Sequence, residues 1–474
     1  MRSLFLFFVI LSIISNCSAQ IYQKQVNQDW FGFCVSNTFR FFDVDDSLFV
    51  DMVEDLSPKL LRFPGGTGGN FYHIDGPAYG ILDSEVDKFY AGNLSRRLPT
   101  LKSISRRKNH NHNYLEDFIK ISKRLETRVL IVANVLTADT SEIISLINRF
   151  HEEDIDIVGV ELGNELSNRA YQSRISSVED YIHICKKYVR VIRSSYPEIE
   201  IAVVAAPIKE KMPHRIKNWN QKLAEENFYD AIVYHSYIHA VDGDSEYGLM
   251  TKETYNSLDK SSAFDLYREN CLSSFRESFV DNILKYNMIF NEKDIWITEW
   301  NLKMTKTTGN TLLQSLFVSH YLMEIFSNPI LDNITVLSFH NLAGRTISGD
   351  IFLSNENDGS FSVHSTYYPL SMIGKIFEND FDRVSMRRVD DLYLYECFDR
   401  DNNIQLVYVI NWYDNSSKIK LSLLEDNKVD VQSFYGSSLF DKADNNGNIL
   451  YRNQEIYNNE IFIDPYSLTL ISID

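Results

Sequence analysis

The chain has few cysteines, a deficit of positive charge and almost no long apolar runs. It holds 5 cysteines among 474 residues, and their wide spacing fits neither a disulfide framework nor a zinc-ligand pattern. Basic residues number 47 against 65 acidic ones, a net charge of −18, which argues against nucleic acid or an anionic membrane surface as a general partner. Solenoid repeats and low-complexity linkers are also missing. With 44% hydrophobic and 13% aromatic residues, the sequence instead predicts a globular protein with a large core.

The amino terminus has the pattern of a secretion signal. Arg2 supplies the positive start, and an apolar stretch follows from Leu4 to Ile14. This stretch is too short to span a bilayer stably, and no other segment predicts a transmembrane helix. Residues 1–19 are therefore predicted to be a signal peptide, so a secreted or periplasmic protein is expected. A lipid anchor on Cys17 is the less favoured alternative, because Asn16 is a poor match for the small residue that such sites prefer.

Strand-like apolar runs alternate with amphipathic helical stretches over most of the chain, a pattern typical of βα units around a parallel sheet. Two of the helical stretches are Leu115 to Leu125 and Val178 to Ile192, where apolar residues recur at helical spacing. Eight βα units predict an α/β fold, a (β/α)8 TIM barrel over residues 20–372. The eight runs are Trp30 to Val35, Lys59 to Phe63, Arg128 to Ala133, Ile157 to Leu162, Glu200 to Ala205, Asp230 to His235, Ile295 to Glu299, and Ile334 to Phe339.

The pattern changes after about Phe377. Short alternating strands with polar turns follow, such as Leu392 to Cys397 and Ile404 to Trp412. This arrangement predicts an antiparallel β-sandwich domain over residues 373–474. The extended segment 20–29 is a candidate to pair with that domain. The four cysteines beyond the signal region are expected to be buried thiols, with one or two bridges as the alternative.

Two carboxylates stand where buried strands run out. Glu165 comes three residues after the fourth strand-like run, and Glu299 ends the seventh. Strand tips of a barrel converge on one rim, and strands four and seven lie on opposite sides of the central cavity. Two acids placed there can flank one glycosidic bond, as glycoside cleavage requires. The alternative is that the two acids are unrelated glutamates of surface loops, and for either acid considered alone this alternative would be preferred.

Polar residues at other strand ends support the same site. Arg62 is costly at the end of a buried strand unless a carboxylate pairs with it, and pairing with Glu299 would keep that acid ionised. The amide of Asn164 is expected to bind the sugar hydroxyl beside the reacting carbon. Tyr237 is a candidate donor to the nucleophile. The remaining candidates for substrate binding are Asn134 at the end of strand three, His235, which could instead be a satisfied core histidine, and Trp300, which could stack on a sugar ring.

Several motifs resemble those of glycoside hydrolase clan A. They are Gly163-Asn164-Glu165, Thr298-Glu299-Trp300-Asn301, Arg62 with Pro64-Gly65-Gly66, and His235-Ser236-Tyr237. The second and third are similar to the α-L-arabinofuranosidase and β-xylosidase branches, whereas the run from Glu161 to Glu165 is similar to the heparanase and β-glucuronidase branch. The resemblance implies a retaining (β/α)8 glycosidase with Glu165 as acid/base and Glu299 as nucleophile. It implies no metal or cofactor, and no cluster of His, Asp and Cys suggests a metal. One departure is a longer loop after the second strand.

That loop is the basic insertion, residues 96–112. It contains six Lys or Arg residues and no acid, a local reversal of sign in an acidic chain. It favours an acidic or sulfated glycan as substrate, and a solvated loop is the alternative. The functional prediction is a secreted retaining hydrolase of a polysaccharide or oligosaccharide. The alternatives are a glycan-binding protein on a barrel scaffold and a polysaccharide lyase. The sequence does not specify the oligomeric state.

Overall fold

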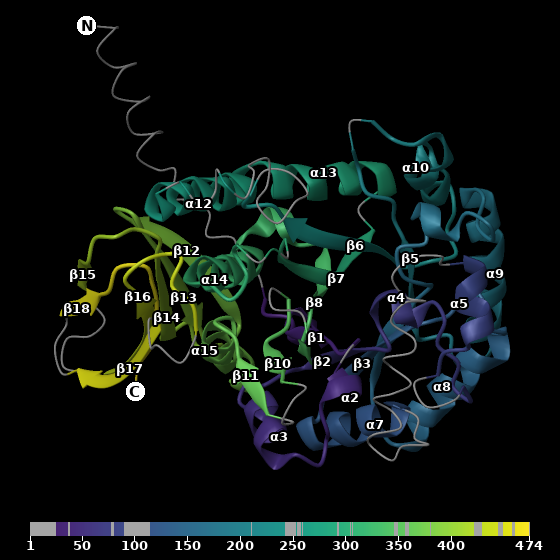
Figure 1. Ribbon diagram of the computed structural model, residues 1–474, viewed down its shortest axis with the longest axis horizontal. Coiled ribbons are helices and arrows are strands. Elements are labelled where there is room, and N and C mark those ends of the chain that lie inside the picture. Colours follow the sequence, from purple (N-terminus) through teal and green to yellow (C-terminus); the bar gives the residue numbers. More distant parts are fainter. Residues whose placement is uncertain are drawn as a thin grey trace, which may run out of the picture.

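The computed structural model shows a closed parallel barrel of strands β1 to β8 in sequence order (Figure 1). It describes residues 25–36, 38–76, 80–89, 114–209, 211–241, 253, 257, 259–291, 293–303, 305, 307–345, 349–355, 360–379, 381–420, 429–443, 449–456 and 460–473. The barrel strands are β1 (Gly32–Cys34), β2 (Leu60–Phe63), β3 (Arg128–Val132), β4 (Ile157–Glu161), β5 (Glu200–Val204), β6 (Ala231–Ile238), β7 (Asp294–Leu302) and β8 (Ile334–Phe339). Six of them lie within the predicted runs, whereas β6 continues past its predicted end and β7 extends beyond its predicted run at both ends.

Apolar side chains fill the inside of the barrel. Trp296 of β7 lies there completely buried among Leu130, Val233 and other residues of the surrounding strands. Gly159 of β4 makes room for it, since a Cβ on Gly159 would lie 2.3 Å from the Trp296 ring. These packed apolar side chains fill the barrel interior, so the polar side chains of an active site can gather only at the rim.

Helices surround the barrel. They are α2 (Thr38–Phe41), α3 (Ser47–Glu54), α4 (Gly66–Gly69), α5 (Asp83–Phe89), α7 (Tyr114–Leu125), α8 (Thr140–Glu152), α9 (Val178–Ser195), α10 (Trp219–Ala224), α12 (Lys260–Arg276), α13 (Ser278–Phe290) and α14 (Leu312–Ser327). The start of α9 is fixed by a capping box between Ser177 and Asp180. Its predicted apolar face, which includes Tyr181 and Cys185, is buried against the barrel.

The C-terminal part is an antiparallel sandwich, as predicted. Helix α15 (Tyr367–Glu378) leads into a six-stranded sheet of order β12-β13-β14-β19-β16-β17. Strands β15 (Ser417–Lys420) and β18 (Glu460–Ile463) form the second layer, and Ile419 and Ile461 pack on the apolar face of the larger sheet. The larger sheet consists of β12 (Arg383–Val389), β13 (Leu392–Phe398), β14 (Ile404–Asn411), β16 (Val429–Gly436), β17 (Ile449–Ile456) and β19 (Ser467–Ile473). A small sheet of β9 (Ala343–Gly344), β10 (Phe352–Ser354) and β11 (Phe361–Val363) precedes α15.

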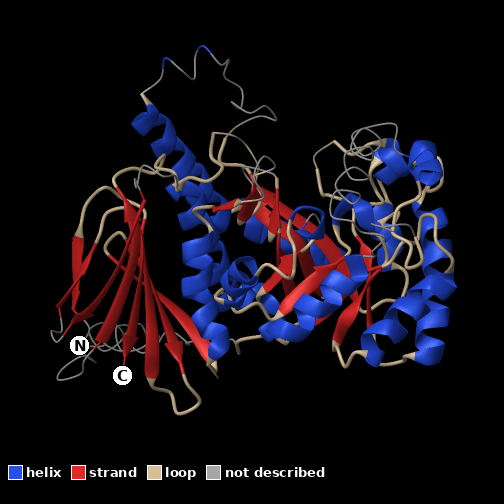
Figure 2. Ribbon diagram, turned by 60° about the horizontal axis from the view of Figure 1, so that its bottom comes forward, coloured by secondary structure: helices blue, strands red, loops and turns tan. Residues whose placement is uncertain are grey.

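The other face of the six-stranded sheet packs on the helices around the barrel. Figure 2 shows these helices between the sheet and the barrel strands. Trp412 donates its indole hydrogen to Nδ1 of His320 in α14 at 3.0 Å, and both side chains are buried. Gln25 forms an antiparallel bridge with Arg383, the first residue of β12, so the chain before the barrel reaches the sandwich. Helix α15 spans the expected domain boundary at 372/373.

Two predicted segments, the signal peptide (1–19) and the basic insertion (96–112), lie outside the described residues. Within the described ranges, no helix is both long and apolar enough to cross a bilayer. Cys34, Cys185, Cys271 and Cys397 are free and buried, which confirms the prediction of buried thiols.

Candidate active site

Irregular strand pairing sets which side chains reach the barrel interior near the rim. Alternation counted from Trp296 would place Thr298 inside and Glu299 outside. The registers of β7 with β6 and with β8 both shift over this stretch. Such a shift has the effect of a bulge, which re-aims the following side chain, and Glu299 faces inward. A similar shift in the pairing of β3 with β4 brings Gly159, and with it Glu161, to the inside.

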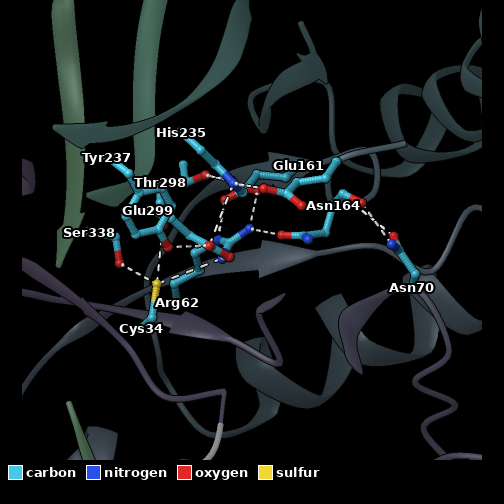
Figure 3. Close-up of polar contacts among 11 residues, drawn as sticks. Cys34, Arg62, Asn70, Glu161, Asn164, His235, Tyr237, Thr298, Glu299 and Ser338 are labelled. Carbon is cyan, nitrogen blue, oxygen red and sulfur yellow. Dashed lines mark hydrogen bonds and ion pairs between the residues drawn. The ribbon is translucent and has the colours of Figure 1, made fainter. Parts of the chain in front are cut away.

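Arg62 is the centre of the polar network in Figure 3. Its completely buried guanidinium forms a two-point ion pair with Glu161, with Nε–Oε1 at 2.7 Å and Nη2–Oε2 at 2.8 Å. Nη2 also donates to Oδ1 of Asn164 at 2.9 Å, and Nη1 donates to Oε1 of Glu299 at 2.9 Å. One arginine therefore fixes three side chains from β4, the loop after it, and β7. The expected pairing of Arg62 with Glu299 is present.

Glu299 is buried and surrounded by donors. Besides Arg62, Tyr237 donates its hydroxyl hydrogen to Oε2 at 2.8 Å, and Nδ1 of His235 lies 3.5 Å from the same oxygen. Burial raises the pKa of Glu299, but His235, His340 and Arg62 outweigh it and hold the pKa well below its ordinary value. Burial and the adjacent carboxylate raise the pKa of Tyr237 well above its ordinary value, so its hydroxyl stays a donor. Glu299 is thus held as a carboxylate.

Glu165 differs from Glu299 in its exposure. Its side chain is 47% exposed, against 7% for Glu299, and its Oε1 lies 3.0 Å from Nδ1 of His235. Burial lowers the pKa of His235, yet the two carboxylates outweigh burial and raise it. One oxygen of each carboxylate and a ring nitrogen of His235 all lie within 4.8 Å of one another. Glycosidases hold their two catalytic acids about 5 to 9.5 Å apart, so these two carboxylates are close enough to act on one glycosidic bond.

The loop between β4 and Glu165 has an unusual backbone. Gly163 has a φ of 92°, and Glu165 itself has a φ of 50°, a left-handed conformation that costs a residue with a side chain about 1 kcal/mol or more. The loop is fixed by Asn70, which donates to the carbonyl of Asn164 at 2.7 Å and accepts from its backbone N–H at 2.8 Å. This strained turn directs Glu165 back toward His235 and Glu299.

Two candidate residues take other roles in the structure. Asn134 is buried, and its amide bonds the backbone of Tyr72, Leu136 and Thr137 and the hydroxyl of Thr137, so it shapes its own loop. Trp300 is 1% exposed, and its ring stacks on Tyr321 with centroids 4.5 Å apart. The stacking of Trp300 on a sugar ring, expected from the sequence, is therefore corrected to packing between β7 and α14.

Sequence reasoning missed three contributors to the network, namely Glu161, Asn70 and Cys34. The signal for Glu161 was an acid in the buried part of a strand, which implies a cationic partner. Asn70 gave no signal beyond its place in a glycine-rich turn. The thiol of Cys34 donates to the carbonyl of Thr298 at 3.1 Å, and burial raises its pKa to about 12, so it is a neutral support for β7.

Within the described part of the chain, the one group with the donors and spacing of a metal site is Glu165, His235 and Glu299. Arg62 already donates to Glu299 from inside the site, and its fixed positive charge disfavours a cation beside that carboxylate. The arrangement is better suited to a carboxylate pair acting directly on a substrate.

No family model and no curated protein matches the sequence, but solved structures share its architecture. The GH51 arabinofuranosidase from Xanthomonas axonopodis pv. citri aligns with a TM-score of 0.64 and 14% identity, covering 95% of this chain and 97% of its own. A family 51 α-L-arabinofuranosidase from Bifidobacterium longum gives 0.68 and 11%, covering 96% and 98%. A 4-O-α-L-rhamnosyl-β-D-glucuronidase from Fusarium oxysporum gives 0.60 and 12%, covering 96% and 98%.

These neighbours are clan A (β/α)8 glycosidases. The fold that the motif resemblance implied is therefore confirmed across nearly the whole chain. At 11–14% identity, the likeness shows a shared fold and leaves the substrate open.

Proposed function

We propose that the protein is a secreted retaining glycoside hydrolase that cleaves a polysaccharide or an oligosaccharide derived from one. The observation that supports this most is the pair of carboxylates within 4.8 Å of each other, one buried and ionised and the other exposed. A nucleophile must be ionised, and an acid/base must be reachable by the leaving oxygen and by water. Glu299 meets the first requirement and Glu165 the second.

In the first step, a carboxylate oxygen of Glu299 attacks the anomeric carbon. The bond from that carbon to the leaving oxygen breaks, and the proton of Glu165 goes to this oxygen. The product is a glycosyl ester of Glu299. Tyr237 and Arg62 hold the two Glu299 oxygens in place, so that little motion is needed to reach the attacking geometry.

In the second step, Glu165 takes a proton from water, and the water oxygen attacks the same carbon. The ester bond breaks, Glu299 leaves as a carboxylate, and the sugar keeps its original anomeric configuration. His235 contacts both acids, so it holds the two carboxylates in fixed positions relative to each other through both steps.

Asn164 is placed to assist the reacting sugar. Because Arg62 donates to its Oδ1 at 2.9 Å, the Nδ2 group is oriented as a donor. An amide donor beside the acid can bind the hydroxyl next to the anomeric carbon, a contact that strengthens in the transition state.

Two observations favour hydrolysis over binding alone. Both acids are present and converge, whereas a glycan-binding protein has no need of a buried carboxylate held ionised by an arginine. The clan A fold of the neighbours is likewise that of glycosidases. Secretion is supported by the signal-like pattern of residues 1–19.

The test is a screen of synthetic aryl glycosides, followed by NMR of the first-formed anomer. We expect release of the sugar with retained configuration, and Glu299→Gln should lower kcat by roughly 10⁴-fold or more without changing Tm by more than a few degrees. Glu165→Ala should keep turnover of substrates with good leaving groups, and added azide should raise that rate and yield the glycosyl azide of retained configuration. An inverted first product, or full activity of Glu299→Gln, would overturn the proposal.

A further inference from the structure

A cavity of about 760 Å³ opens beside Glu165, which we call the Glu165-side cavity. It lies between the loops that follow β4 and β5 and the middle of β6. Its volume is in the range of sites that hold small ligands, about 300 to 1,000 Å³.

The lining shows which part of a substrate this cavity would receive. Glu165 and His235 line it, whereas Glu299 is not among the lining residues. In the proposed mechanism, the acid contacts the leaving oxygen and the nucleophile contacts the sugar that is attacked. A cavity on the acid's side therefore takes the leaving portion of the substrate. This step rests on the proposed function.

The charge of the cavity is opposite to that of the protein. Its described lining has four Arg or Lys residues and one acid, Glu165, although acids outnumber bases 65 to 47 in the whole chain. Arg169 comes from the loop after β4, and Lys209, Lys211 and Arg215 come from the loop after β5. Two separate loops thus direct cations into one space, which focuses a positive potential there.

These cations are available to a ligand. Arg169, Lys209 and Lys211 are exposed, and no carboxylate among the described residues forms an ion pair with them; Glu210, between the two lysines, lies outside the description. Arg215 donates to the backbone carbonyl oxygens of Leu166 and Ile175. Carbonyl oxygens satisfy its hydrogens without cancelling its charge. Arg169, Lys209 and Lys211 therefore keep their positive charge unpaired among the described residues, whereas Asp180 acts on the charge of Arg215.

The rest of the cavity suits a sugar ring. Val204, Ala205, Pro207, Val233 and Tyr234 give it an apolar wall, against which the C–H face of a pyranose can pack. We propose that the Glu165-side cavity binds a leaving sugar that bears a carboxylate or sulfate group, and that Arg169, Lys209 and Lys211 recognise that anion. Arg169, Lys209 and Lys211 lie outside the basic insertion, so this proposal does not depend on residues 96–112.

The test uses three substrates that share the attacked sugar and differ only in the leaving sugar: a uronic acid, its carboxyl-reduced neutral form, and that neutral form bearing one sulfate. We expect the wild type to show a kcat/KM at least tenfold higher for one or both anionic members. In Arg169→Gln/Lys209→Gln/Lys211→Gln, this ratio should fall to within about twofold of unity, since each exposed ion pair accounts for roughly two- to fivefold. Raising NaCl to 1 M should lower the wild-type ratio. The member that is preferred identifies the anion.

The matched control is Lys187→Gln/Arg190→Gln/Lys285→Gln, which removes the same charge from exposed positions that do not line the cavity. This variant should keep the wild-type ratio. Equal kcat/KM on the neutral and both anionic members in the wild type would overturn the inference and leave the proposed function intact. If none of the three is hydrolysed, the anion site is tested by calorimetry, which compares binding of the uronate disaccharide and of its carboxyl-reduced form to the wild type. Tighter binding of the uronate that the cavity variant loses supports the anion site, and equal binding overturns it.

Discussion

Arg62 donates through Nη1 to Oε1 of Glu299 at 2.9 Å, in a position where the guanidinium is completely buried. Its other edge is occupied by Glu161. The three groups together hold one positive and two negative charges, so one negative charge is left over. Because Glu161 makes the two-point pair, Arg62 gives Glu299 a single hydrogen bond, and Tyr237 and His235 complete the stabilisation of this carboxylate.

Arg62→Met should leave two acids buried without their partner. Removing one member of a buried ion pair typically costs about 3 to 5 kcal/mol of folding free energy. The pKa of Glu299 is held below its ordinary value in part by Arg62. Without Arg62, the pKa of Glu299 should rise, and the acid limb of the kcat/KM profile should move to higher pH. The wild type should show no such limb from Glu299 above about pH 4. Chemical denaturation and pH profiles measure the two effects.

Arg62→Lys is the control for charge alone. It keeps a cation but cannot contact Glu161 and Glu299 with one planar fork. Its acid limb should lie between those of the wild type and Arg62→Met. A wild-type pH profile in Arg62→Met would show that Arg62 does not set the ionisation of Glu299.

Tyr237→Phe should lower kcat with little change in KM. The hydroxyl contacts Oε2 of Glu299 at 2.8 Å, so it positions the nucleophile and leaves substrate affinity to other residues. Hydrogen bonds to charged groups contribute about 1.5 to 3 kcal/mol, which corresponds to a fall of roughly tenfold to a hundredfold. Steady-state kinetics on one aryl glycoside measures the split. An increase in KM at constant kcat would assign Tyr237 to substrate binding alone.

The sequence predicted the barrel well because periodic apolar runs and strand-tip acids are local signals. It also predicted the pairing of Arg62 with Glu299, since a buried cation needs an anion. It could not predict the register shifts that turn Glu299 inward, because alternation counted from Trp296 places that residue outside. The left-handed φ of Glu165 depends on Asn70, which is distant in sequence. Trp300 failed as a stacking residue because its packing partner comes from α14.

His73 should stabilise the protein more at acidic than at alkaline pH. Its Nε2 lies 2.7 Å from Glu85 and its Nδ1 lies 3.0 Å from Glu142. Burial lowers the pKa of His73, but the hydrogen bonds to Glu142 and Glu85 outweigh burial and raise it. A raised folded-state pKa gives a stability that is complete below the unfolded value of about 6.5 and lost as pH rises through the folded value.

The measurement for His73 is the Tm difference between the wild type and His73→Gln from about pH 5.5 to pH 9. The difference should be largest at about pH 5.5 and should shrink as pH increases, since an uncharged His73 no longer attracts the two acids. His214→Gln, at an exposed position in the loop after β5, is the control and should show no such trend. A Tm difference that grows with pH would contradict the assigned sign.

Gly159→Ala should disturb the packing of Trp296 inside the barrel, next to the active site. A Cβ at this position would lie 2.3 Å from the Trp296 ring and 2.7 Å from the carbonyl oxygen of Glu200, so neither the indole nor the backbone has room. Overpacking of this kind typically costs about 1 to 3 kcal/mol. Trp296 lies three residues before Glu299 on β7 and Gly159 two before Glu161 on β4, so a shift in either strand should also lower kcat. Denaturation and kinetics of Gly159→Ala measure both losses. Gly68→Ala is the control, because its Cβ would approach only the ends of two side chains, Nη2 of Arg40 at 3.1 Å and Cδ1 of Ile81 at 3.8 Å; equal stability of the two variants would show that Trp296 does not depend on the space at Gly159.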